Sequence, residues 1–475
     1  MKSLLLGNGI NIQFGGVAYT SSFIIKRMKY KSLMSEYSEL FDYTISAAEL
    51  NQLFNGFVDE ANQIIKKKYD KYVPKGDDNT ISALRDFQKR YRVEVKEPSD
   101  IMLEDWLFIV HMFFLKNSDL EEARIAGITG FERLLLDAIY NEGDLQRIYL
   151  KMGKPIKKLI NRYENVFTLN YDNNIELLTG RKVFHLHGDF SILADTENPK
   201  MVNGYINNRE GKTVVQKNWE HCYCNALLNY SGDLKMKRIK DNEQAIEVAR
   251  KYISEINGDR TTLENIQKKN PVIYNILRTL LDNPDLEVAS DYHFNNLRNI
   301  SGELHIIGMS PNNDSHVFDT ILNNKKLNKI VFYYKDSSQK EYIEKIFPKG
   351  LLSCKSVDLL WKSMGCDSKE MNYAYTIPDR FDELVAAGNA LSGENITTQN
   401  LLHSLKNISP IEMRRLNQLV DEELQKGTSK KDSITFEEQS AQRASISYIA
   451  LRNGILPTVL YVICVMKGKW YNTDE

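Results

Sequence analysis

The sequence predicts an α/β protein with a Rossmann-like parallel sheet, large helical insertions and a C-terminal helical module. Short apolar segments rich in β-branched and aromatic residues alternate with helical stretches, as in a doubly wound sheet. These segments are apolar on both faces, which is typical of strands covered by helices. The first of them runs directly into a cluster of glycines, a common beginning of a nucleotide-binding fold.

The first predicted strand, 2–6, ends at Gly7, and Gly9 follows two residues later. Glycines at this point allow the backbone to turn tightly and to approach the phosphates of a ligand. From residue 21 to residue 163, apolar residues such as Trp106 and Val110 recur at helical spacing. We expect this segment to form a first helical insertion.

Four further strands are predicted at 166–169, 183–186, 304–307 and 330–334, with helices at 144–163 and 318–323. Between residues 191 and 300 the sequence is polar and mostly helical, which predicts a second insertion. The basic run 235–240 within it is interpreted as solvated surface.

Beyond residue 369 the predicted strands stop, and helices are expected at 381–391, 397–405, 410–426 and 436–453. At roughly 150 residues per domain, a chain of 475 residues predicts two or three domains. We therefore expect a catalytic domain over 1–368, interrupted by insertions at about 21–163 and 191–300. A separate helical module over 369–475 would serve assembly or partner binding.

The composition excludes several classes of protein. A hydrophobic content of 42% excludes a disordered chain, and a net charge of −1 provides no global attraction to nucleic acid or an anionic membrane. Five cysteines without repeated C-x-x-C spacing argue against a disulfide framework and a structural zinc site. The apolar run 455–466 contains Pro457 and is shorter than the roughly 18 residues of a membrane span. We expect a soluble, cytoplasmic protein without direct nucleic-acid binding.

Four short motifs lie at the ends of predicted strands. Because ligands of open parallel sheets bind outside the carboxyl ends of the strands, these motifs are expected to meet around one crevice. They are Gly7-Asn8-Gly9-Ile10-Asn11, Thr168-Leu169-Asn170-Tyr171-Asp172, His185-Leu186-His187-Gly188-Asp189 and Gly308-Met309-Ser310-Pro311-Asn312-Asn313-Asp314.

In this order the motifs resemble those of sirtuin-like NAD-consuming domains, in the bacterial branch found in anti-phage defence systems. The chain is also similar to AbiH-type abortive-infection proteins. The family's G-A-G-x-S turn is similar to residues 7–11, with Asn at the second and fifth places. Its Asn-x-Asp, His-Gly and Gly-x-Ser motifs are similar to 170–172, 187–188 and 308–310. The likeness covers about 1–30, 160–195 and 295–365.

The resemblance implies an NAD site with Asn170 and His187 as catalytic residues. Cleavage of the N-glycosidic bond requires orientation of the ribose and delivery of water. Asn170 has both an amide donor and a carbonyl acceptor, so we assign it orientation of the ribose and the water. His187 titrates near neutrality and is assigned as general base. The expected NAD-binding residues are Gly7, Asn8, Gly9, Asn11, Asp172, Gly308, Ser310, Asn312 and Asp314.

Each motif also has a structural interpretation. Asn170 to Asp172 alone fits an Asx turn that caps a helix at 173–178. One of His185 and His187, which share a strand face by the period of two, is expected to be structural. Asp314 or the next residue fits a helix N-cap. A His-x-His pair can hold a metal, but no third ligand cluster is evident, so no metal is expected.

The leading hypothesis is an NAD glycohydrolase, with NAD as substrate, acting as a gated effector of anti-phage defence. The helical material that the chemistry does not require predicts gating by a homo-oligomer or by a protein partner from the same defence operon. A non-catalytic module that senses NAD or ADP-ribose is the alternative. An NAD-dependent protein deacylase is disfavoured, because such sirtuins carry two C-x-x-C pairs and this chain has none.

Overall fold

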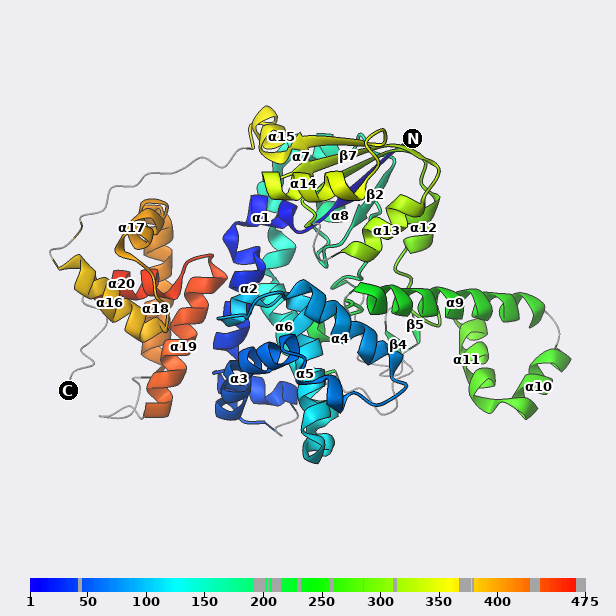
Figure 1. Cartoon of the computed structure of the whole chain (residues 1–475), viewed down its shortest axis with the longest axis horizontal. Helices are drawn as coiled ribbons and strands as arrows, with labels where there is room; N and C mark the ends of the chain where they lie inside the picture. Colours follow the sequence, from blue (N-terminus) through cyan, green and yellow to red (C-terminus); the bar gives the residue numbers. More distant parts are fainter. Residues whose placement is uncertain are drawn as a thin grey trace. The chain divides into compact units, whose positions relative to one another are not determined.

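The protein is described by a computed structural model, and it contains a parallel β-sheet flanked by helices (Figure 1). The structure describes residues 1–41, 45–191, 201–202, 205–206, 215–228, 232–256, 260–284, 286–310, 314–366, 377, 380–427 and 436–466.

Six strands form the sheet in the order β3-β2-β1-β6-β7-β8, and every neighbouring pair is parallel. The strands are β1 (Lys2–Leu6), β2 (Asn165–Thr168), β3 (Phe184–His185), β6 (Gly302–Ile307), β7 (Leu327–Tyr334) and β8 (Leu352–Ser356). Counted along the chain this is the order 3-2-1-4-5-6, whose topological switch point lies between β1 and β6. The α/β, Rossmann-like fold class is confirmed.

All five predicted strands occur in this sheet, and β8 is its one strand that the sequence did not indicate. β8 is an edge strand containing Ser353 and Lys355, so it lacks the apolar pattern of the central strands. In contrast, Leu4 and Leu5 of β1 point to opposite faces and are both fully buried, as expected for a strand covered on both sides.

Helices cover both faces of the sheet. They are α1 (Gly9–Gly15), α7 (Tyr149–Ile160), α8 (Asn174–Thr179), α12 (Phe294–Asn299), α13 (Ser315–Asn323), α14 (Ser337–Ile346) and α15 (Val357–Ser363). Right-handed crossovers put α7 and α8 on one face and α13 and α14 on the other. Phe318 of α13 and Ile343 of α14 are buried in one cluster with Phe332 of β7, which anchors these helices to the sheet.

The second insertion contains a small hairpin, β4 (Met201–Val202) with β5 (Tyr205–Ile206), and the helices α9 (Gly232–Ile256), α10 (Arg260–Lys269) and α11 (Pro271–Asp282). The interpretation of 235–240 as surface is wrong for Lys235, which is only 2% exposed. Lys237, Arg238 and Lys240 are exposed, as expected. A helix presents successive residues about 100° apart, so a basic run cannot face solvent throughout.

The chain divides into two compact units. The first contains residues 1–14, 70–92 and 142–365, and therefore the sheet. The second contains residues 15–69, 93–141 and 366–475. Besides the sheet-flanking helices, the first unit includes α4 (Asp78–Arg90).

The helices of the second unit come from both ends of the chain. They are α2 (Ser21–Lys31), α3 (Ala47–Ile65), α5 (Leu103–Lys116), α6 (Glu121–Tyr140), α16 (Phe381–Ser392), α17 (Thr398–Lys406), α18 (Pro410–Gly427), α19 (Phe436–Arg452) and α20 (Pro457–Met466). This division differs from the expected boundary at 368/369, because α2 packs on α19. Buried Arg27 of α2 donates to the carbonyl oxygens of Ala18, Ala138 and Leu451.

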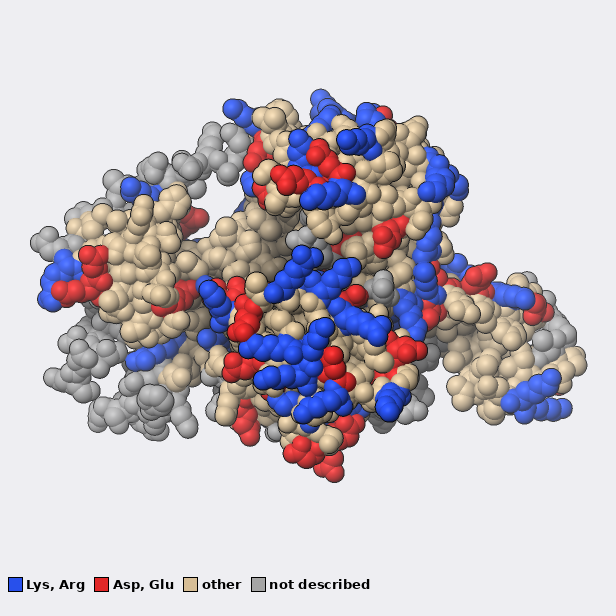
Figure 2. All heavy atoms as spheres, in the orientation of Figure 1, with Lys and Arg blue, Asp and Glu red and all other residues tan. Residues whose placement is uncertain are grey.

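Among the described residues no single helix is long and apolar enough to cross a membrane. The apolar run 455–466 forms α20, and residues 440–452 and 457–464 reach that length only as a pair bent by 113°. On the face in Figure 2, basic side chains gather over α4, which carries Arg85, Lys89 and Arg90, with acidic side chains among them.

Candidate functional site

The glycine turn after β1 packs directly against the loop after β6. Gly7 N donates to Ile307 O (2.9 Å), and Gly9 N donates to Gly308 O (2.8 Å). A Cβ atom added at Gly9 would lie 2.5 Å from Gly308 Cα. The two loops therefore meet backbone to backbone at the switch point. This close approach leaves no room for a side chain at Gly7 or Gly9.

We expect Gly9→Ala to destabilise the protein by about 1–3 kcal/mol, because backbone atoms must move to admit the methyl group. Gly350→Ala is the matched control, since a Cβ atom there meets nothing within 4 Å. Urea unfolding of both variants measures the difference. Equal midpoints for the two variants would contradict this account.

Asp172 is a buried carboxylate that joins α1 to the loop after β2. It accepts hydrogen bonds from Asn11 Nδ2 (2.5 Å), Asn174 N (3.1 Å) and Asn174 Nδ2 (2.6 Å). The bond from Asn174 N is that of an Asx turn before α8, as expected, although the N-cap of α8 is Asn173, which makes no side-chain capping bond. Burial raises the pKa of Asp172, although the hydrogen bonds that it accepts act in the opposite direction.

The bond to Asp172 also orients Asn11. Because a carboxylate only accepts hydrogen bonds, the amide nitrogen of Asn11 must face it, and Asn11 Oδ1 faces elsewhere. That oxygen is buried and has no hydrogen-bond partner among the described residues. A buried acceptor of this kind is available to a hydroxyl group of a ligand.

Asn170 lies between the glycine turn and His185. Its Nδ2 atom is 3.4 Å from Gly7 O, and its backbone oxygen accepts from His185 Nδ1 (3.0 Å). His185 Nε2 is also 2.8 Å from Glu176 Oε1, so both ring nitrogens act as donors. Burial opposes charge on this ring, but the hydrogen bond and charge of Glu176 raise the pKa of His185. These contacts make His185 the structural member of the His-x-His pair.

His187 does not share the contacts of His185, because β3 ends at His185 and the following residues leave the strand. Leu227 N donates to His187 O (2.8 Å), and Asp189 N donates to Asn225 Oδ1 (2.9 Å), which fix this loop to residues 225–227. Gly188 has φ +78°, and a Cβ atom there would lie 2.3 Å from Asn225 O. The glycine is therefore needed for the turn that directs His187.

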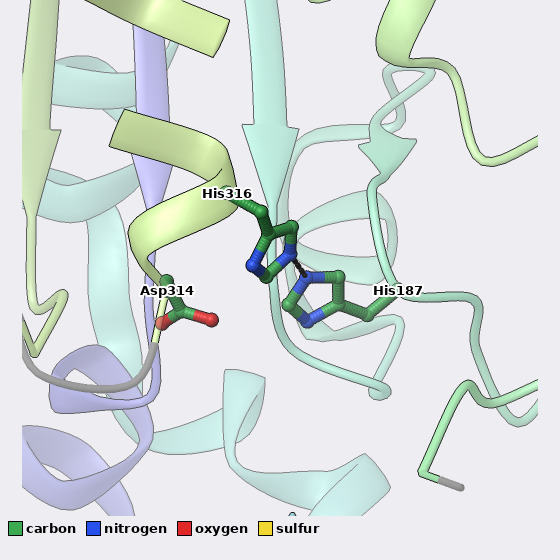
Figure 3. Close-up of side chains that lie close together, drawn as sticks. All are labelled: His187, Asp314 and His316. Carbon is green, nitrogen blue, oxygen red and sulfur yellow. Dashed lines mark hydrogen bonds between the residues drawn. The ribbon is translucent and has the colours of Figure 1, made fainter. Parts of the chain in front are cut away.

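The side chain of His187 meets His316, in the first turn of α13 (Figure 3). Their Nε2 atoms are 3.0 Å apart, and both rings are buried, with 3% and 2% of their surface exposed. β3 and β6 are three places apart in the sheet, about 14 Å at ordinary strand spacing. The contact therefore spans the carboxyl ends of β2 and β1.

Burial lowers the pKa of His187 well below its ordinary value and that of His316 to about 3, and the charge of Lys235 acts in the same direction. Both imidazoles are therefore neutral at pH 7. Lys235, on α9, makes no ion pair with any residue that the structure describes. The buried groups around His187 thus combine neutral nitrogen acceptors with one cation.

The structure brings together some of the predicted residues and not others. Gly7, Gly9, Asn11, Asn170, Asp172 and Gly308 are linked by the contacts above. Asn8 and Ser310 are exposed, and Asn312 lies outside the described residues. Asp314 is the N-cap of α13 by position, without a side-chain capping bond, and it lies beside His187 and His316.

Sequence reasoning missed His316 and Lys235. A histidine in the first turn of the helix after β6 was a signal for His316, because that turn faces the switch point. No pattern in the sequence indicated Lys235, which was read as part of a basic surface run. No protein-family model, curated protein or solved structure matches the chain.

Proposed function

We propose that the protein is a sirtuin-like NAD glycohydrolase that acts as an effector of anti-phage defence. The observation that supports this most is the position of buried Asn11, Asn170, Asp172 and His187 at the carboxyl ends of β1, β2 and β3. Doubly wound sheets bind dinucleotides in the crevice at the topological switch point, which in this sheet lies between β1 and β6. The chemistry of these side chains also suits a ribose and its N-glycosidic bond.

In the proposed reaction, the bond between ribose C1′ and the nicotinamide nitrogen breaks, and its electron pair neutralises the pyridinium ring. A water molecule oriented by Asn170 attacks C1′, and His187 takes the proton that the water loses. The products are nicotinamide, ADP-ribose and one proton. A neutral His187 is a competent base, and its low pKa limits the strength of that base.

Two further groups suit the rest of an NAD molecule. Lys235 supplies a buried positive charge close enough to His187 and His316 to lower their pKa values, and this favours an anionic group such as a phosphate. Asn11 Oδ1 offers an unused acceptor to a ribose hydroxyl. Both features support a ligand that carries phosphate and sugar.

One contact favours the alternative function of a sensor. His187 Nε2 is already engaged by His316, so this nitrogen is not available to a water molecule while the contact lasts. A module that binds NAD or ADP-ribose without turnover needs no base at this position. Hydrolysis with Nε2 as the basic nitrogen requires that His187 separate from His316 when NAD binds.

We also propose that hydrolysis is gated by self-association or by a protein partner, because an enzyme that depletes NAD must be silent in healthy cells. The helical second unit carries none of the predicted catalytic residues, which leaves it available for this role. Full-speed hydrolysis by the purified monomer would contradict gating.

The test is release of nicotinamide and ADP-ribose in equal amounts when the purified full chain is incubated with NAD at increasing protein concentration. We expect release to rise more than proportionally with concentration if assembly activates the enzyme. NAD binding without release, measured by calorimetry on the same samples, would favour the sensor. Turnover of an acyl-lysine peptide with NAD would instead identify a deacylase.

A further inference from the structure

We infer that His187, His316 and Asp314 form a binding site for a divalent transition-metal ion of the zinc type. The three residues come from two separate parts of the fold, the loop after β3 and the start of α13 (Figure 3). One donor atom from each residue lies within 4.8 Å of the other two. This inference goes beyond the proposed function and differs from the expectation of no metal, which considered the His185-x-His187 pair alone.

The geometry of the imidazoles suits a shared ion. Two nitrogens bound to one tetrahedral zinc at about 2.0–2.1 Å are roughly 3.3 Å apart, and the two Nε2 atoms here are 3.0 Å apart. A small separation of the rings would admit the ion. His316 Nδ1 is also buried without a hydrogen-bond partner among the described residues, so the described protein groups leave this ring incompletely satisfied.

Two imidazoles and one carboxylate are a common ligand set for zinc and for other first-row divalent ions. Such a set leaves at least one coordination position for a water molecule or a ligand. The positive charge of Lys235 acts on both histidines, so it favours an anion, such as hydroxide or a phosphate oxygen, at that position. The charges of Asp314 and of this anion would offset the repulsion between Lys235 and the metal.

A neutral imidazole has one unprotonated nitrogen, so His187 cannot bind the metal and accept a proton at the same time. Metal binding and proton abstraction therefore describe two alternating states of the site, and the test must measure metal binding without reference to turnover.

The experiment uses the purified full chain, stripped with a chelator and titrated with Zn²⁺ by calorimetry and with Co²⁺ by visible absorption. We expect one equivalent of metal and the intense absorption of tetrahedral Co²⁺. His316→Gln, which removes one ligand, should lower the affinity at least about 100-fold, since changes in outer-shell partners alone cost 10–100-fold. Asp314→Asn is a second variant, with an expected loss of about 10-fold or more.

His305→Gln is the matched control, because His305 lies on β6 in the same unit and contacts Tyr163 and Glu303 instead of the cluster. It should bind metal as the unaltered protein does, and circular dichroism checks that each variant is folded. Absence of saturable binding to the unaltered protein would overturn the inference. Equal loss of affinity in His316→Gln and His305→Gln would overturn it as well. Metal binding by the unaltered chain, combined with no NAD hydrolysis by the metal-free chain, would count against the proposed function alone.

Discussion

His187→Ala is expected to lower nicotinamide release by about 10²–10⁴-fold, the usual contribution of a positioned general base. The variant removes the only group at this site that we assign to accept the proton of the attacking water. Asn170→Ala is expected to cost roughly 10²-fold, because the water and ribose lose their orientation. Chromatographic measurement of nicotinamide under the conditions in which the unaltered chain is active tests both.

Two matched controls lie on the same sheet. Asn165→Ala changes an asparagine at the opposite end of β2, where it contacts Ser3, and His305→Gln changes a half-buried histidine of β6. Both should retain most of the activity. Hydrolysis by His187→Ala at the rate of these controls would exclude His187 as the base.

The pH dependence provides a separate check on His187. Because burial lowers its pKa below the ordinary 6.5, the ring loses its basic form only under more acidic conditions. The acid limb of kcat/KM should therefore lie below pH 6.5, with activity falling as the pH falls through the pKa of the folded protein. This limb should be absent from the residual activity of His187→Ala.

Lys31→Met is expected to destabilise the second unit by about 3–5 kcal/mol, since it leaves the buried carboxylate of Asp137 without its cation. Lys31 and Asp137 are 1% and 5% exposed in their side chains and form an ion pair. Tyr37 also hydrogen bonds to both, and Lys31 Nζ lies 4.3 Å from the centroid of the Tyr448 ring. These groups connect α2 and α6 to α19.

Lys26→Met is the matched control, because Lys26 lies on the same helix and pairs with Glu394 at a more exposed position. Its loss should cost no more than about 1 kcal/mol. The double variant Lys31→Met with Asp137→Leu removes both charges and should recover most of the lost stability. Urea unfolding measures all three. A single Lys31→Met variant as stable as Lys26→Met would contradict a buried, mutually dependent pair.

The sheet was predictable because a strand that is buried on both faces needs apolar residues at successive positions. Such a strand appears in the sequence as a continuous apolar segment, for example Leu4-Leu5-Leu6. The glycine turn and the Asn-x-Asp motif were also recognisable, since both follow such segments directly. β8 was not, because an edge strand tolerates polar residues. The unit boundary was missed for another reason: packing of α2 on α19 joins residues about 400 positions apart, and no local pattern records that pairing.

The sequence by itself determined the fold class and marked Asn11, Asn170, Asp172 and His187 as candidate site residues at strand ends. Only the tertiary structure decided what surrounds them. It set His316 against His187, buried Lys235 beside both, brought Asp314 into the same cluster and packed Gly9 against Gly308. The physical reason for this difference is that the pattern of a strand is set by residues adjacent in the sequence, so the sequence alone reveals it. The approach of His187 to His316, by contrast, depends on how the loop after β3 and the first turn of α13 pack across the carboxyl ends of β2 and β1.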